Sequence, residues 1–158
     1  MHSRKMLLLA GVLVGTLLLF RCRYSFILTV GDSMRPTISN GTMLLLDRSA
    51  YRCHPPQRGD IVVADYFGER ITKRVVGLPE EKVAVEEGRV MINGAPLEED
   101  HAVTAGTLTI EPGRLQSGRY ALLGDNRNYA TGETIHAVVT RDQILGRVVG
   151  SCGGQPGR

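Results

Sequence analysis

The chain has 158 residues, which is enough for one domain with an appendage. It contains no Trp, three Phe and five Tyr, so its core must be mainly aliphatic. The net charge is only +3, and the sequence has no basic stripe with interleaved aromatic residues, which leaves a nucleic-acid-binding function with little support.

The first predicted element is an N-terminal membrane anchor. Residues 6–20 form a run without a charge, with basic residues on both sides. As a helix this run reaches about 22 Å, short of the bilayer core of about 30 Å, but snorkelling arginines and local thinning can absorb the difference. A cleavable signal peptide is the alternative, yet residues 20–23 offer no small-x-small cleavage site. We therefore expect residues 1–23 to be an uncleaved anchor that is transmembrane over about residues 6–20.

An apolar run at residues 26–30 predicts a strand that leads into a turn containing Ser33. Gly31 allows backbone geometry that other residues resist, and Pro36 ends any strand and disfavours helix at Arg35. Such a turn can present the serine hydroxyl and the serine backbone N–H together. An ordinary Gly-Asp-Ser turn, which is common, is the alternative.

The next predicted strands are a buried one at residues 42–47 and another at residues 61–66, separated by a loop with two prolines at residues 49–57. A short hairpin connection at residues 67–69 then leads into a strand that contains Lys73. This order indicates a mostly β protein with few helical segments beyond the anchor.

Lys73 shares a strand face with Ile71 and Val75, because alternate side chains of a strand point the same way. Arg74 points to the opposite face. Burial disfavours the ammonium form, and documented buried lysines reach pKa values of about 5–6. A neutral amine can take a proton from a serine hydroxyl, which an arginine cannot do because its guanidinium stays protonated. The alternative is an edge-strand lysine whose stem lies along the core and whose tip lies in water.

Two hairpin strands are predicted at residues 82–86 and 89–92, followed by a polar, turn-rich excursion at residues 98–118. The remaining predicted elements are strands at residues 120–123, 137–140 and 144–149 and a Gly-rich tail at residues 150–158 that we expect to be disordered.

The other chemistry-bearing residues give weaker signals. His136 is the histidine we consider for a conventional Ser–His pair, and we rank it below Lys73. The cysteines, Cys22, Cys53 and Cys152, cannot all pair within one chain, and a Cys53–Cys152 bridge would need an oxidising compartment. Because the adjacent Cys53 and His54 make a poor ligand pair, we expect no metal site.

Several segments, in order, resemble the motifs of type I signal peptidases. Residues 31–38 resemble the nucleophile motif, and residues 73–79 resemble the general-base motif. The others are residues 58–63, which resemble a strand motif, residues 124–127, which resemble the start of the last motif, and residues 142–148, which resemble the closing strand. One motif would be weak, but the ordered set is strong and spans about residues 28–149.

Carried over motif by motif, the resemblance implies that Ser33 is the nucleophile and Lys73 its general base. It places Met34 beside the substrate groove near the membrane surface, and we assign Gly31 and Thr72 to the groove and oxyanion site as well. The implied activity is cleavage of signal peptides from exported proteins after small residues, with no metal or cofactor.

The family fold implies a mostly β catalytic domain, a barrel or a sheet, at residues 24–149, with a small β insertion at about residues 80–118. The implied partners are precursor proteins with signal peptides and the lipid bilayer, with no nucleic acid, and the protein is expected to be a monomer. The resemblance, rather than the flanking charges, implies a single-pass protein of the cytoplasmic (inner) membrane with its catalytic domain on the extracytoplasmic side.

Two departures from the family pattern affect the site. Gly31 stands where many members carry a hydroxyl that completes the oxyanion hole, so a substitute donor is expected. Ala130 stands where the family's last motif has a serine that hydrogen-bonds the lysine, and Thr131 could replace it after a one-residue slip. We expect the residues before them to support the site structurally, as a turn that holds the neighbouring strand against the Lys73 region: Asp125, Asn126 and Arg127.

Two other functions stay open. The altered last motif would suit a dedicated maturase for one substrate, such as a conjugation pilin, and it would also suit a non-catalytic, membrane-tethered relic of the family. Self-cleaving SOS-repressor peptidases have a related dyad fold, but they lack an N-terminal apolar anchor, so residues 6–20 argue against that identity.

Overall fold

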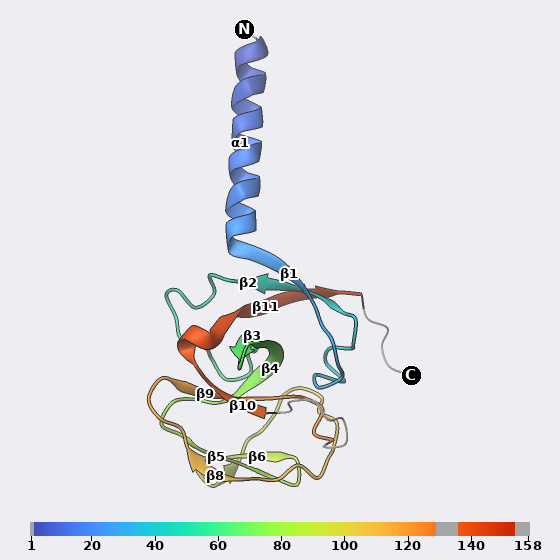
Figure 1. Ribbon diagram of the computed structural model, residues 1–158, viewed down its shortest axis with the longest axis vertical. Helices are drawn as coiled ribbons and strands as arrows, with labels where there is room; N and C mark the ends of the chain where they lie inside the picture. Colours follow the sequence, from blue (N-terminus) through green and yellow to red (C-terminus); the bar gives the residue numbers. More distant parts are fainter. Residues whose placement is uncertain (1, 129–135, 154–158) are drawn as a thin grey trace.

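In the computed structural model, which describes residues 2–128 and 136–153, one long helix precedes two β-sheets (Figure 1). Helix α1 spans His2–Arg23. The larger sheet consists of β1 (Tyr24–Leu28), β2 (Met43–Asp47), β3 (Ile61–Tyr66), β4 (Glu69–Gly77), β9 (Arg119–Leu123), β10 (His136–Thr140) and β11 (Ile144–Cys152). The smaller sheet consists of β5 (Lys82–Glu86), β6 (Arg89–Ile92), β7 (Ala95–Pro96) and β8 (Ile110–Arg114), and a short 3-10 helix, Arg141–Gln143, precedes β11.

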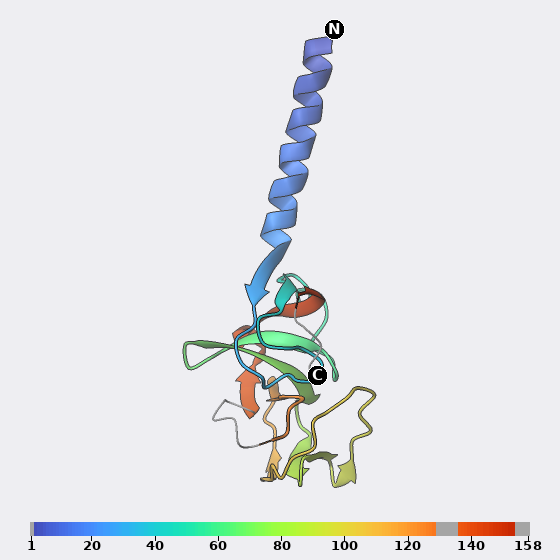
Figure 2. The same ribbon diagram turned by 90° about the vertical axis from the view of Figure 1, so that its right-hand side faces the viewer.

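Helix α1 projects away from both sheets, and the turned view in Figure 2 shows the same separation. Apolar side chains along it, among them Val12, Leu13 and Val14, are exposed. Within the part of the chain that the structure describes, no helix combines the length and the apolar character that crossing a bilayer requires. The predicted transmembrane span at residues 6–20 therefore stays a prediction.

The larger sheet is open. Its strand order is β1-β2-β11-β3-β4-β9-β10, and within the described residues the edge strands β1 and β10 do not pair with each other. Of the two forms expected from the family resemblance, the sheet is confirmed, and a closed barrel is wrong. The strands predicted with both bounds lie within one residue of their expected positions, with two exceptions. The first strand begins and ends two residues early, and β11 ends three residues late.

Strand β9 explains how the two sheets pack. Tyr120 and Leu122 point into one aliphatic cluster, which also contains residues of β3, β4 and β10. Ala121 and Leu123 point to the other face, into a second cluster that the smaller sheet completes. Because both faces of β9 are covered, its sequence is a continuous apolar run rather than an alternating one.

The smaller sheet lies at the end of the molecule remote from α1 (Figure 1). It comprises residues 82–114, within the range predicted for the insertion. A polar, turn-rich excursion was expected at residues 98–118, but part of that segment, Ile110–Arg114, forms β8 and pairs with β5. The disordered tail was predicted to start at Gly150, but residues 150–152 are ordered, because β11 continues to Cys152 by pairing with β2. Residues 154–158 lie outside the described residues.

The three cysteines are free and exposed, so no Cys53–Cys152 bridge forms.

Candidate active site

Ser33 and Lys73 lie side by side although 40 residues separate them. The Nζ atom of Lys73 lies 2.7 Å from Ser33 Oγ and 3.2 Å from the backbone carbonyl oxygen of Thr72. Both residues are buried, with 8% of Ser33 and 3% of Lys73 exposed. The alternative of an edge-strand lysine with its tip in water is therefore wrong.

The packing of β4 accounts for the position of Lys73. Ile71 and Val75, its neighbours on the same strand face, are both buried in the aliphatic cluster beneath the larger sheet. Strand β3 pairs with this part of β4, with Val62 opposite Lys73. The lysine is thus held among aliphatic side chains, and this placement disfavours a charged amine unless a partner compensates for the lost hydration.

Two features hold the turn that carries Ser33: the packing of the residue after the serine and the backbone conformation of Gly31. Met34 is buried and packs with Ile38 and Leu44. Gly31 has a φ of +97°, a conformation that glycine adopts without the strain other residues incur. Its backbone N–H donates to Asn40 Oδ1 at 3.1 Å. The absence of a side-chain hydroxyl at position 31 therefore follows from the backbone conformation of this turn.

Asn126 ties the serine turn to the end of β9. Its backbone N–H donates to the carbonyl oxygen of Ser33 at 3.0 Å, and its side-chain amide donates to the carbonyl oxygen of Asp32 at 3.2 Å. Both bonds join segments more than 90 residues apart in the sequence. They restrict the orientation of the peptide units on either side of the Ser33 Cα atom.

Asp125 is fully buried and neutralises Arg74. The Arg74 guanidinium donates two hydrogen bonds to it, from Nε to Oδ1 at 2.9 Å and from Nη2 to Oδ2 at 2.7 Å. The hydroxyl of Thr37, from the serine turn, donates to the same carboxylate at 2.5 Å. Asp125 therefore links β4 to the serine turn, on the strand face opposite Lys73.

Arg127 connects this region to the smaller sheet. Its buried guanidinium donates to the carbonyl oxygens of Gly124 and Gly88 and to Glu99 Oε1, at 2.7, 2.6 and 2.6 Å. Gly106 packs so closely against it that a Cβ atom there would lie 1.7 Å from the Arg127 carbonyl oxygen.

Sequence reasoning missed Glu99, Thr37 and His101, which all belong to this network. Thr37 lies within the nucleophile motif, and its hydroxyl was the available signal. His101 was missed because it lies in the segment taken for an excursion. Its Nε2 atom lies 3.4 Å from Glu99 Oε1 and 3.5 Å from Asp125 Oδ1. No sequence pattern indicated that this segment would pack against the end of β9.

A groove of about 630 Å³ opens beside the Ser33–Lys73 pair. Three residues assigned to it from the sequence line it: Gly31, Met34 and Thr72. Its two long walls are residues 26–31, which include the end of β1, and residues 69–73 of β4.

Other predicted residues do not join this site. Ala130 and Thr131 lie outside the described residues. His136 is exposed on β10 and lines a different cavity, so the structure gives no support to its pairing with Ser33. Among the described residues, no three His, Cys, Asp or Glu side chains gather in a way that could hold a metal ion.

Comparison with known proteins agrees with the sequence motifs. The family described as "Signal peptidase, peptidase S26" matches residues 3–151. Signal peptidase I of Leptolyngbya laminosa is 36% identical, over 75% of this chain and 63% of that protein. Signal peptidase I of Bacillus caldolyticus is 30% identical, over 88% of this chain and 84% of that protein. This chain thus spans less than two thirds of the length of the first relative.

Among solved structures, a signal peptidase I from Enterococcus faecalis aligns with 58% of this chain and 95% of its own chain, at 27% identity and a TM-score of 0.44.

Proposed function

Because the chain belongs to the signal peptidase (peptidase S26) family, we propose that it is a membrane-bound serine endopeptidase that removes signal peptides from exported precursors. The observation that carries this proposal is the 2.7 Å separation of Lys73 Nζ and Ser33 Oγ, both buried at the side of an open groove.

The chemistry follows from this pair. A neutral Lys73 amine takes the proton of the Ser33 hydroxyl while Ser33 Oγ attacks the scissile carbonyl carbon. The lysine then gives this proton to the leaving amine, and an acyl-enzyme on Ser33 remains. Lys73 next takes a proton from a water molecule, which attacks the ester, and gives that proton to Ser33 Oγ as the acyl C–O bond breaks and the product leaves. The Lys73 amine thus accepts and releases a proton once in acylation and once in deacylation, and both half-reactions use the same base.

The oxyanion is stabilised in this account by the backbone N–H of Ser33. The hydrogen bonds from Asn126 to the carbonyl oxygens on either side hold that peptide unit in place before substrate arrives. Preorganised donors of this kind contribute strongly because they do not have to reorient in the transition state.

The groove suits an extended substrate. Within the described residues β1 pairs only with β2, and residues 69–73 of β4 pair only with β3, so each wall of the groove carries an open strand edge. A substrate strand lying between these edges can form main-chain hydrogen bonds along its length and place its scissile carbonyl near Ser33.

Membrane attachment is the second part of the proposal. Helix α1 projects from the catalytic domain with exposed apolar side chains, and the run at residues 6–20 holds no charge. We expect Leu13→Lys to lower the fraction of protein that stays with membranes after carbonate extraction. The same substitution at an exposed site of the catalytic domain, Phe67→Lys, is the control. Equal retention of both variants would argue against α1 as the anchor.

The proposed activity is tested with the full chain in detergent and a fluorogenic peptide that carries Ala-x-Ala before the cut. Ser33→Ala and Lys73→Ala should each abolish cleavage and leave the circular dichroism spectrum unchanged. Matched controls are Ser117→Ala and Lys82→Ala, an exposed serine and an exposed lysine outside the groove. Cleavage at the wild-type rate by purified Lys73→Ala would remove the base assignment, and no cleavage by the wild-type protein would favour a non-catalytic relic.

A further inference from the structure

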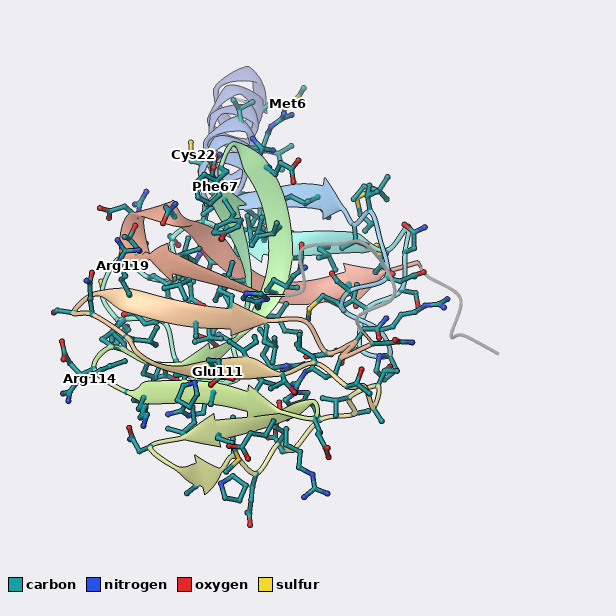
Figure 3. The ribbon with its side chains drawn as sticks, turned by 60° about the horizontal axis from the view of Figure 1, so that its bottom comes forward. Met6, Cys22, Phe67, Glu111, Arg114 and Arg119 are labelled. Carbon is teal, nitrogen blue, oxygen red and sulfur yellow. The ribbon has the colours of Figure 1, made fainter. Side chains whose placement is uncertain are left out.

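A second groove lies between the two sheets, on the face of the larger sheet opposite Lys73. Its volume is about 380 Å³, and it shares no lining residue with the groove beside Ser33. Its floor is aliphatic, and its rim carries charged side chains that Figure 3 labels. The floor includes Val76, Val83, Val85, Ile110, Leu115 and Val138.

The groove exists because the smaller sheet leaves β10 uncovered. Ala137 and Val139 of β10 are buried in the aliphatic cluster on the other face of the larger sheet. Val138 lies opposite Ala121 of β9, on the face toward the smaller sheet, and 40% of it is exposed. Its exposure contrasts with the full cover of Ala121, which shares that face of the sheet. The apolar face of β10 that is turned toward the smaller sheet is therefore partly open to solvent.

The outer edge of β10 is unprotected among the described residues. Strand β10 pairs with β9 alone, and its five residues, His-Ala-Val-Val-Thr, include no proline, lysine or acidic side chain. Its pairing with β9 contains no register shift. Proteins commonly protect an exposed edge with such residues or with a bulge, because an open row of backbone donors and acceptors invites another strand.

The rim of the groove favours a negatively charged occupant. Arg114 and Arg119 lie on it together with one acidic residue, Glu111. The side chain of Arg114 is 73% exposed and lies 3.6 Å from Glu80. Figure 3 shows Arg114 and Arg119 toward one end of the paired strands, with Glu111 farther along β8. Glu80 partly offsets the charge of Arg114, whereas Arg119 makes no ion pair among the described residues, so its charge attracts an acidic group to that end.

We propose that this groove binds an extended segment of a partner protein, with alternating apolar side chains and an acidic residue, that adds as a strand to β10. A peptide uses both features of the site, because its backbone pairs with the strand edge while alternate side chains enter the aliphatic floor. A lipid chain would leave the edge unpaired, and the groove lies far from α1, the segment that we propose as the membrane anchor (Figure 1).

The probe is a fluorescein-labelled peptide of alternating Val and Thr with Glu at both ends, titrated into the full chain in detergent and followed by fluorescence anisotropy. We expect saturable binding to wild-type protein and to Ser33→Ala alike, because the two grooves are separate. Val138→Lys should weaken binding by about tenfold or more. Phe67→Lys, at an exposed apolar residue on the β3–β4 connection, should have no effect.

Arg119→Glu tests the charge of the rim without altering the edge. It should weaken binding of the Glu-flanked peptide and strengthen binding of a matched Lys-flanked peptide. Hydrogen exchange supplies an independent readout, because strand addition should slow exchange of the backbone amides of β10. Equal binding by wild-type protein and both variants, or binding without protection of β10, would overturn the proposal. A change in self-association on Val138→Lys with no bound peptide would overturn it too.

Discussion

Lys73 and Arg74 are adjacent cationic residues on one strand, both are buried, and the protein treats them in opposite ways. Arg74 lies against the Asp125 carboxylate, which accepts two of its hydrogen bonds. Lys73 lies among aliphatic side chains with the Ser33 hydroxyl beside its amine. An arginine stays protonated and so requires a counter-charge when buried, whereas a lysine can lose its proton. In the mechanism that we propose, one strand face keeps a charge and the other accommodates its loss.

The largest effect on activity should come from placing an arginine on both faces of β4. Lys73→Arg places a permanent cation beside Ser33 and removes the ability to accept a proton, so kcat/KM for the peptide substrate should fall by about 10³-fold or more. Arg48→Lys, at an exposed arginine, is the control and should cleave normally. A Lys73→Arg enzyme within tenfold of the wild type would show that the amine serves only as a charge.

Removing the carboxylate that neutralises Arg74 on the other face should mainly lower the stability of the fold. Asp125→Asn leaves the Arg74 charge buried without its carboxylate, which should lower the free energy of unfolding by about 3–5 kcal/mol. Chemical denaturation of the full chain in detergent measures this loss. The exposed Asp142→Asn is the matched control. If both substitutions change stability by less than 1 kcal/mol, the Arg74–Asp125 pair does not hold the two segments together.

Substitutions of Gly31, in the turn that carries Ser33, should have a smaller effect on stability. Because Gly31 has a positive φ, Gly31→Ala should destabilise the fold by about 1–3 kcal/mol, and Gly31→Ser should not raise activity although it restores a hydroxyl. Gly113→Ala, at a glycine with open space around its Cα and no positive φ, should be nearly neutral. A Gly31→Ser enzyme faster than the wild type would contradict the backbone explanation of this glycine.

The ion pair between Arg23 and Asp47, which lies outside the site, offers a half-exposed counterpart to the buried Arg74–Asp125 pair. Burial alone would raise the pKa of Asp47, but hydrogen bonds from Arg23 and Ser49 outweigh it and leave the pKa of Asp47 below its usual value. A lowered pKa adds stability above the unfolded carboxyl's range, and this stability is lost as the pH falls through the folded value. The contribution should be only about 1 kcal/mol, because most of the Arg23 side chain is in water.

Thermal unfolding of wild-type protein and Asp47→Asn between neutral pH and about pH 2 measures this contribution. The stability difference between the two proteins should be largest near neutral pH and shrink below about pH 4. A difference that does not change with pH would mean that the carboxylate charge at position 47 contributes nothing.

The sequence predicted most strands because apolar runs bounded by Gly and Pro are local signals, and β3 was placed at its observed residues. It also placed Lys73 on the face shared with Ile71 and Val75, as the packing of β4 bears out. It failed to predict that Arg74 is buried as well, because the carboxylate that makes this possible lies 51 residues away. The contact of His101 with Asp125 was likewise out of reach, since it depends on how the smaller sheet packs.

The most direct test of the central claim is the rate at which an acylating peptide probe modifies Ser33, followed by mass spectrometry of the intact chain and of its Ser33 peptide. The wild-type protein should gain one acyl group on Ser33, and Lys73→Arg should gain none at any pH from about 6 to 9, because its guanidinium stays protonated throughout this range. Acylation of Lys73→Arg at the wild-type rate would contradict the account of Lys73 as the base for Ser33.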